Sequence, residues 1–182
     1  MFDIIKFLQY LEAAILNINQ EIYEIPTTYE SKGIQRERIF CSELSFQYRK
    51  LFEDKFPYKL HSEINKSGHK DFGELIKNID PDFIFHTPGT HNDNFVIIEV
   101  KGNLSNRNLI YKDFEKIFNV MDDEVVHYKF GIFLLYNHSF QELQLKISNL
   151  IENLDSKYDK RIFVICSPES GDIEIRNLCD LR

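Results

Sequence analysis

The sequence has 182 residues, which is the size of one domain and enough to bury a hydrophobic core. Its 43% hydrophobic and 28% charged residues are typical of an ordinary globular protein. No apolar run approaches the roughly 20 residues that are needed to cross a bilayer. The first residues, MFDIIKFLQYLE, include an early Asp3, which is not typical of a signal peptide. We therefore expect no membrane partner.

The three cysteines are Cys41, Cys166 and Cys179. An odd number without CxxC spacing argues against a disulfide framework and against a zinc site. It favours a reducing compartment, so we expect a cytoplasmic protein whose cysteines are small buried apolar residues.

The net charge of −7 is unfavourable for a nucleic-acid partner, because phosphate contacts require Lys and Arg. The excess of acidic residues lies toward the two ends of the chain. Residues 31–116 hold 14 basic and 13 acidic side chains and are therefore close to neutral. This distribution is compatible with a nucleic-acid partner but does not by itself predict one.

Residues 2–25 are predicted to form one amphipathic helix that ends before Pro26. Its apolar stripe has alternating steps of four and three residues: Ile4, Leu8, Leu11, Ile15, Ile18 and Ile22. The stripe either packs on the rest of the chain or forms the seam of a homodimer. The polar segment PTTYESKG (26–33) predicts a linker. We therefore divide the chain into an N-terminal helix (1–25) and a domain over 32–182.

The remaining elements are helices and strands along the rest of the chain. Helices are predicted from apolar residues at helical spacing, and strands from short β-branched or aromatic runs between turn residues. In chain order the predictions are a helix at 35–55, strands at 61–65, 80–86 and 93–101, a helix at 107–123, a strand at 129–136, a helix at 140–158, and strands at 161–167 and 171–178, the last at a sheet edge. This order predicts an α/β fold in which helices cover a central sheet.

The residues that carry chemistry lie at the ends of two neighbouring predicted strands. DPDFIFH (80–86) places Asp82 at the start of one strand, and DNFVIIEVK (93–101) ends the next with Glu99 and Lys101. Alternation assigns one face of the second strand to Phe95, Ile97, Glu99 and Lys101. The turn-rich TPGTHND between the strands predicts a hairpin, which brings Asp82 level with Glu99 and Lys101.

Two carboxylates and an ammonium group at one end of a sheet are typical of a hydrolytic Mg²⁺ site, because hard cations prefer oxygen ligands. The structural alternative is a turn cap at Asp82 beside an exposed ion pair between Glu99 and Lys101.

Pro81-Asp82 followed by Glu99-Val100-Lys101 resembles the motif of the PD-(D/E)xK nuclease superfamily, the fold of many restriction endonucleases. The flanking segments resemble the same family in the same order. RERIFCSELSFQYRKLF is similar to its first core helix and LHSEINK to its first core strand, while DFEKIFNV and YKFGIFLLY are similar to the helix and strand that follow the motif. The resemblance covers residues 32–136 and implies a restriction-endonuclease-like mixed sheet flanked by helices.

The resemblance also implies a function, namely a Mg²⁺-dependent nuclease that hydrolyses phosphodiester bonds of DNA, with Mn²⁺ as an alternative cofactor. Asp82 and Glu99 would bind the metal ion together with the carbonyl oxygen of Val100. Lys101 would orient or help to deprotonate the attacking water, and burial beside a cation would lower its pKa.

A further acidic residue is expected from the helix at 35–55. Glu37 falls in the same inward-facing arc as Phe40 and Leu44, at about 100° per residue, whereas Glu43 lies nearer the edge of that arc. A carboxylate on an apolar face requires a metal ion or a positive partner. Family members carry this acid in a similar Glu-Arg pair, seven residues before a core leucine. We therefore assign Glu37 to catalysis and to the metal, with Glu43 or a plain Glu37 salt bridge as alternatives.

Two other functions remain open. The same fold without catalysis would serve as a nuclease-like binding or assembly module, and an unrelated α/β domain would contain the triplet by coincidence. Intact Asp82, Glu99 and Lys101 argue against a site that has lost its activity. Gln47 and Glu63 are further polar residues that their positions place near the site, and a solvated strand face is the alternative for Glu63.

Overall fold

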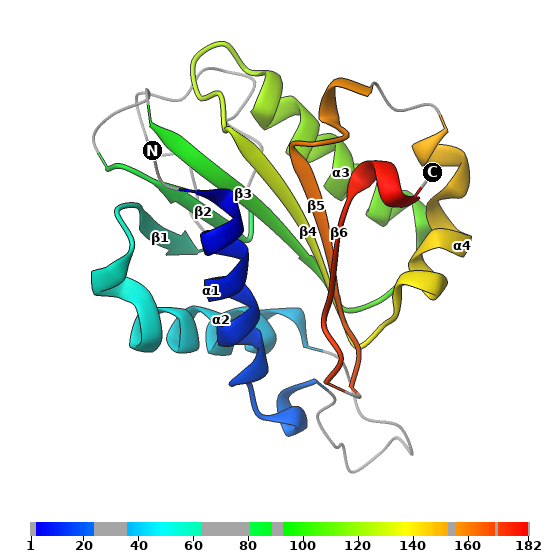
Figure 1. The fold of residues 1–182 in the computed structure, drawn as a ribbon. Helices are drawn as coiled ribbons and strands as arrows, with labels where there is room; N and C mark the ends of the chain where they lie inside the picture. The colour runs from blue at the N-terminus through cyan, green and yellow to red at the C-terminus, as the bar shows by residue number, and fades with distance from the viewer. Residues whose placement is uncertain are drawn as a thin grey trace.

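The computed structural model describes residues 3–23, 36–62, 81–88, 93–152, 156–169 and 171–181. Its centre is a six-stranded mixed sheet in the order β1-β2-β3-β4-β5-β6 (Figure 1). The strands are β1 (Lys59–Ser62), β2 (Phe83–His86), β3 (Asn94–Lys101), β4 (Phe130–Tyr136), β5 (Ile162–Ser167) and β6 (Glu174–Asn177). β3, β4 and β5 are parallel to each other, and the remaining pairings are antiparallel. The sheet confirms the predicted α/β class.

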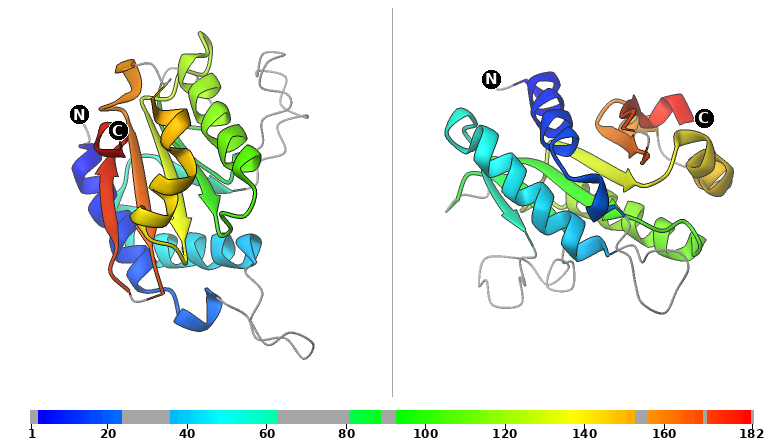
Figure 2. Two further views of the ribbon diagram at one scale, coloured as in Figure 1. Left: turned by 90° about the vertical axis from the view of Figure 1, so that its right-hand side faces the viewer. Right: turned by 90° about the horizontal axis from the view of Figure 1, so that it is seen from below.

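Helices cover both faces of this sheet. The α-helices in the described ranges are α1 (Ile4–Leu16), α2 (Glu37–Phe52), α3 (Arg107–Asp122) and α4 (Phe140–Ile151). Short 3₁₀ turns are η1 (Gln20–Ile22), η2 (Glu53–Lys55), η4 (Ser156–Tyr158) and η5 (Leu178–Leu181). α1 and α2 pack on one face of the sheet, and α3 and α4 pack on the other (Figure 2). Each layer therefore encloses its own hydrophobic cluster.

The N-terminal helix is shorter than predicted. α1 ends at Leu16, and the 3₁₀ turn η1 replaces the end of the predicted helix. The Asn17 side chain donates a hydrogen bond of 2.7 Å to the carbonyl four residues earlier, and Asn19 caps η1 by accepting from a backbone N–H at 3.1 Å. The prediction of one helix over 2–25 is wrong because both asparagines bind backbone groups that a continuous helix would use.

The apolar stripe of this segment is covered by its own chain. Its central members are buried and its two ends are half-buried: Ile4, Leu8, Leu11, Ile15, Ile18 and Ile22. The neighbouring Phe7 is fully buried as well, and its ring meets Phe85 of β2 edge-on with centroids 4.7 Å apart. The stripe is therefore part of the core, and in this fold it is not a free surface for a homodimer seam.

A β-bulge changes which side chains share a face of β3. The register between β2 and β3 shifts after the pair Phe85–Val96, and Phe95 is the extra residue. Phe95 consequently lies beside Val96 in the cluster under α1 and α2, where it stacks on Tyr58 with centroids 4.5 Å apart. Ile97 lies in the opposite cluster, under α3 and α4. The face predicted for β3 is therefore wrong at Phe95 and correct from Ile97 onward.

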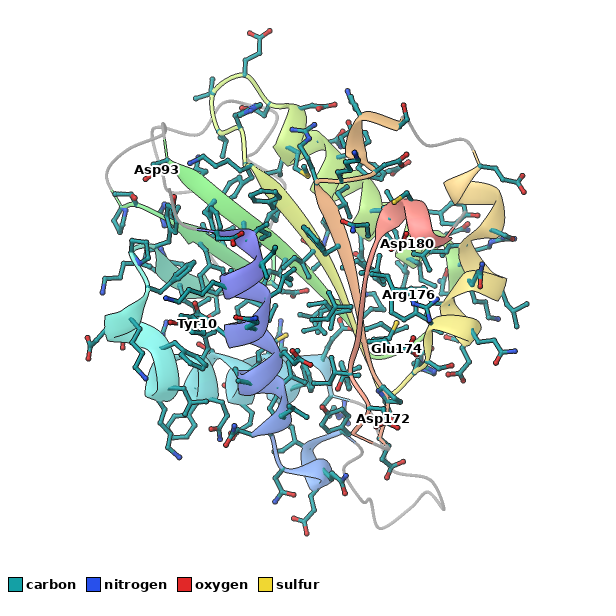
Figure 3. All side chains as sticks on the ribbon, viewed as in Figure 1. Tyr10, Asp93, Asp172, Glu174, Arg176 and Asp180 are labelled. Atoms are coloured by element: carbon teal, nitrogen blue, oxygen red, sulfur yellow. The ribbon has the colours of Figure 1, made fainter. Side chains whose placement is uncertain are left out.

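Strand β6 forms the sheet edge that the sequence predicts, next to β5. Glu174 and Arg176 form an ion pair on it with an N···O distance of 2.5 Å. Figure 3 shows these and other charged side chains along this edge, from Asp172 to Asp180. Charged side chains on an edge strand disfavour pairing with another sheet.

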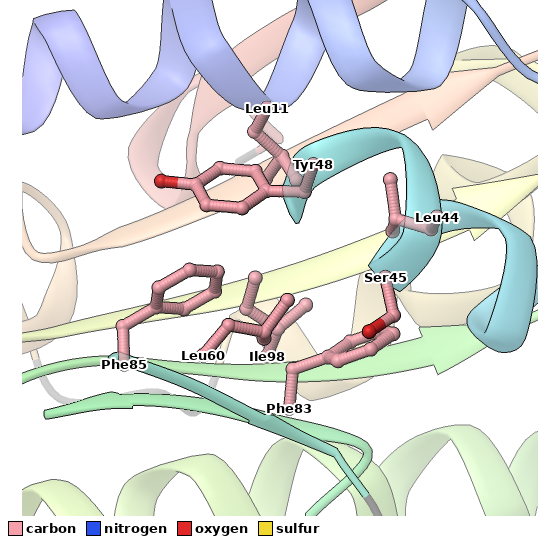
Figure 4. A pocket seen from close by; sticks show the side chains of 8 residues that line it. All are labelled: Leu11, Leu44, Ser45, Tyr48, Leu60, Phe83, Phe85 and Ile98. Carbon is pink, nitrogen blue, oxygen red and sulfur yellow. The ribbon is translucent and has the colours of Figure 1, made fainter. Parts of the chain in front are cut away.

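A small apolar gap lies between α1, α2 and the sheet (Figure 4). Its volume is about 10 Å³, and its lining residues are Leu11, Leu44, Ser45, Tyr48, Leu60, Phe83, Phe85 and Ile98. A volume of this size is at the lower limit for a single water molecule. The gap is thus an imperfection of packing and not a ligand site.

The other predicted helices and strands are found in order, with shifted ends. The predicted linker (26–33), Glu63 and the middle of the hairpin turn lie outside the described residues. Cys41 and Cys166 are buried as predicted, whereas Cys179 is partly exposed. Within the described ranges, no helix has the length and apolar character needed to cross a membrane.

Candidate active site

The predicted motif residues meet at the carboxyl end of β3. Phe83 pairs with Ile98 across β2 and β3, and the next step of this antiparallel register places Asp82 opposite Glu99. Asp82 Oδ2 accepts a hydrogen bond of 2.7 Å from the backbone N–H of Val100. The two halves of the motif are therefore joined directly by this bond.

Glu99 is almost completely buried, with 1% of its surface exposed. Its Oε2 accepts a hydrogen bond from the Lys116 ammonium at 2.9 Å, whereas its buried Oε1 has no hydrogen-bond partner among the described residues. Burial, followed by the negative charge of Asp82, raises the pKa of Glu99 to about 8, although Lys116 opposes the increase. The charged form of Glu99 is thus only partly compensated by its surroundings.

Asp82 has the same electrostatic character. Burial raises the pKa of Asp82 to about 6, although the hydrogen bond from Val100 opposes the increase. The negative charges of Glu37 and Asp113 contribute to this increase. Buried carboxylates that raise each other's pKa have an excess of negative charge, and a bound cation would relieve it.

Lys101 is held between carboxylates from both helical layers. Its Nζ lies 2.8 Å from Asp113 Oδ2 on α3 and 3.6 Å from Glu37 Oε2 on α2. Burial lowers the pKa of Lys101, but the hydrogen bond to Asp113 and the charges of Asp113, Glu37 and Asp82 together outweigh burial and raise it. Carboxylates surround the ammonium group in this arrangement, and the expected decrease in the pKa of Lys101, which requires a bound cation, stays a prediction.

Of the two candidate helix acids, Glu37 is the one that lies at the site. It begins α2, and besides its contact with Lys101 its Oε2 accepts a hydrogen bond of 3.1 Å from the backbone N–H of Gly102. Glu43 instead accepts a hydrogen bond of 2.7 Å from Gln47 on the same helix. The hydrogen bond to Glu43 directs Gln47 along α2 instead of toward the motif.

Gly102 permits a close approach between β3 and the next strand. A Cβ atom at this position would lie 2.3 Å from the ring of Tyr136. That ring is fully buried and stacks on Phe40 of α2, with centroids 4.2 Å apart. Burial, and then the charge of Glu37, raises the pKa of Tyr136. Tyr136 therefore marks the boundary between the hydrophobic core and the charged site.

Two residues of this site, Asp113 and Lys116 on α3, were not predicted from the sequence. Asp113 is buried, and its Oδ1 lies 3.5 Å from Lys116 Nζ while its Oδ2 binds Lys101. One signal for Asp113 was present, because at about 100° per residue it falls beside the apolar arc of Ile110 and Ile117. A carboxylate at such a position requires a positive partner. Lys116 lies further from that arc, and nothing in the sequence pattern marks it.

The donor set fits a hard cation in its chemistry, because Asp82 and Glu99 offer carboxylate oxygens and Glu99 Oε1 has no hydrogen-bond partner among the described residues. The geometry is not closed around one point. In the part of the chain that the structure describes, no group of three or more His, Cys, Asp and Glu residues is positioned to hold a metal ion. Lysine ammonium groups contact Glu99 Oε2 and both oxygens of Asp113. The carboxylates are thus partly neutralised by lysines from the same site.

Comparisons with known proteins identify no relative of this chain. No protein-family model, no curated protein and no solved structure matches the chain. The site is therefore interpreted from its own residues and geometry.

Proposed function

We propose that this chain is a Mg²⁺-dependent nuclease of the PD-(D/E)xK type that hydrolyses phosphodiester bonds of DNA. The observation that carries the proposal is the meeting of Asp82, Glu99 and Lys101 at one end of β3, with Glu37 added from α2. The order of helix, three strands, helix and strand supports a restriction-endonuclease-like fold. DNA as the substrate follows from the family resemblance.

The residues take distinct roles in this proposal. Asp82 and Glu99 would hold the metal ion, and the Val100 carbonyl and Glu37 would be the further oxygen ligands. A bound Mg²⁺ or Mn²⁺ ion would supply an activated water and positive charge for the scissile phosphate. The hydrogen bond from the Val100 N–H orients Asp82 for its role before any ion binds.

Lys101 acts as a donor in this scheme. Without a bound ion, the carboxylates around it raise its pKa, so it is an ammonium group at neutral pH. An ammonium group donates hydrogen bonds and cannot accept a proton from water. Lys101 therefore orients the attacking water or offsets the charge that develops on the phosphate oxygens.

A second function is favoured by the internal ion pairs. Lys101 and Lys116 already form ion pairs with Glu37, Asp113 and Glu99, so these carboxylates are partly neutralised without a metal ion. A nuclease-like module without catalysis, used for binding or assembly, would keep such a network for stability alone.

One assay separates these functions. Purified chain is incubated with Mg²⁺ or Mn²⁺ and with single-stranded, double-stranded and branched DNA, and with RNA. The variants are Lys101→Ala and, as a matched control, Lys112→Ala, which removes an exposed lysine from α3. We expect cleavage of DNA by the wild type and the control, and none by Lys101→Ala. Equal cleavage by all three proteins, or no cleavage by any of them, would overturn the proposed nuclease activity. The binding or assembly module would then be the remaining proposal.

A further inference from the structure

Lys116 is a lysine outside the motif that contacts the most buried carboxylate of the site. Its Nζ lies 2.9 Å from Glu99 Oε2 and 3.5 Å from Asp113 Oδ1. Its side chain remains 35% exposed, so the ammonium group reaches Glu99 from the solvent side of α3. Lys116 is therefore paired with Glu99 while part of its side chain remains in contact with solvent.

The contact has a direct consequence for metal binding. Glu99 has two oxygens, of which Oε2 binds Lys116 and Oε1 has no hydrogen-bond partner among the described residues. A Mg²⁺ ion binds carboxylate oxygen at about 2.1 Å, so an ion on Glu99 would lie close to the ammonium group. A divalent cation and an ammonium group at that separation repel each other strongly in a buried site. The ion and Lys116 therefore compete for Glu99.

Asp113 offers Lys116 a second position. It lies one helical turn earlier on α3, and its Oδ1 is already near the ammonium group. Its other oxygen, Oδ2, lies 2.8 Å from Lys101 Nζ, so Asp113 forms ion pairs with both lysines. A small movement of the flexible lysine side chain thus transfers it from Glu99 to Asp113 without leaving a carboxylate unpaired.

We propose that Lys116 is the resident counter-ion of Glu99, which a divalent metal ion must displace onto Asp113, so that Lys116 sets the metal concentration that the site requires. This inference rests on the proposed function, because it assumes that Glu99 is a metal ligand. Lys116 acts through Glu99 and is a positioning residue, not a catalytic one.

The test is the affinity for Mn²⁺, measured by isothermal titration calorimetry on the full chain. Lys116→Gln removes the competing charge, and we expect its dissociation constant to fall about tenfold. Lys112→Gln makes the same charge change at an exposed position on the same helix, and we expect a change of no more than about twofold. Glu99→Gln should abolish the binding, which assigns the signal to this site.

A second variant, Lys116→Arg, tests the same inference if Lys116→Gln does not fold. Lys116→Arg retains the charge and holds a carboxylate through a planar fork, so we expect weaker Mn²⁺ binding than in the wild type. An unchanged or weaker affinity in folded Lys116→Gln, or an unchanged affinity in Lys116→Arg, overturns the inference while leaving the nuclease intact. A wild type that neither binds Mn²⁺ nor cleaves DNA overturns the proposed function and the inference together.

Discussion

The backbone N–H of Val100 donates a 2.7 Å hydrogen bond to the carboxylate of Asp82, so the strand that carries Glu99 also orients its partner acid. The Asp82 carboxylate thus does two things that a substitution can separate: it accepts this hydrogen bond, and it carries a negative charge. A side chain that accepts the hydrogen bond but carries no charge should preserve the fold and abolish the cleavage of DNA.

Asp82→Asn and Asp82→Ala test this separation. Asparagine retains an acceptor for Val100 N–H, so we expect its free energy of unfolding to stay within about 1 kcal/mol of the wild type, whereas alanine should lose about 1–2 kcal/mol more. Both variants should lose Mn²⁺-dependent cleavage of DNA. Urea denaturation and a cleavage assay measure the two effects. Equal stability of the two variants would show that the hydrogen bond contributes little.

Lys101→Met should abolish cleavage and retain metal binding. Methionine fills a similar volume without the charge, so the loss of activity should be at least about 100-fold. The ion pairs to Asp113 and Glu37 are lost, which should lower the free energy of unfolding by about 1–3 kcal/mol. Circular dichroism verifies the fold, and calorimetry with Mn²⁺ verifies the metal site. Retained cleavage in a folded Lys101→Met would remove Lys101 from the mechanism.

The stability of the wild type should decrease as the pH rises. Burial raises the pKa of Asp82 from 3.8 to about 6 and that of Glu99 from 4.5 to about 8, so between these values the folded state binds more protons than the unfolded chain. The free energy of unfolding therefore falls from about pH 4 to about pH 8. Urea titrations without divalent ions at pH 5 and pH 8.5 measure the slope.

Glu99→Gln isolates one contribution to that slope. We expect this variant to be more stable than the wild type at pH 8.5, on the order of 2 kcal/mol, and to show a flatter pH dependence. Glu115→Gln, an exposed position on α3, is the control and should leave the slope unchanged. A wild-type slope that persists in Glu99→Gln would assign the pH dependence to another group.

Gly102→Ala should destabilise the fold. Its Cβ would meet the Tyr136 ring at 2.3 Å, so the ring or β3 must shift, at a cost of about 1–3 kcal/mol. Tyr136→Phe, by contrast, removes a buried hydroxyl that has no hydrogen-bond partner among the described residues, and should be neutral or slightly stabilising. Thermal unfolding of both variants measures the difference. A Gly102→Ala protein as stable as the wild type would show that the close approach is unimportant.

The sequence was sufficient for the order of helices and strands, because apolar periodicity and turn residues act locally. It also placed Asp82, Glu99 and Lys101 at one sheet end, since register and alternation are short-range rules. The bulge at Phe95 was not predictable in this way. The position of the bulge depends on the packing of the Phe95 ring against Tyr58, which is distant in the sequence.

The charge state of the site was also beyond the sequence pattern. The pKa of Lys101 depends on Asp113, which approaches it from a helix whose rotation is set by packing. The residue at which α1 ends was also not predictable from the spacing of the apolar residues. Asn17 and Asn19 favour the break, but the heptad spacing of the apolar residues continued through them.

The contact between Gly102 and Tyr136 has a mechanical consequence. α2 reaches the end of β3 through Glu37, which accepts from the Gly102 N–H, and through Phe40, which stacks on Tyr136. The first turn of the helix is thereby fixed to two adjacent strands by contacts of different kinds. A tilt of α2 would have to break a hydrogen bond and unstack two rings at once. The start of α2, from which Glu37 reaches the site, is therefore tied to the sheet at a helix end, where fraying is otherwise expected.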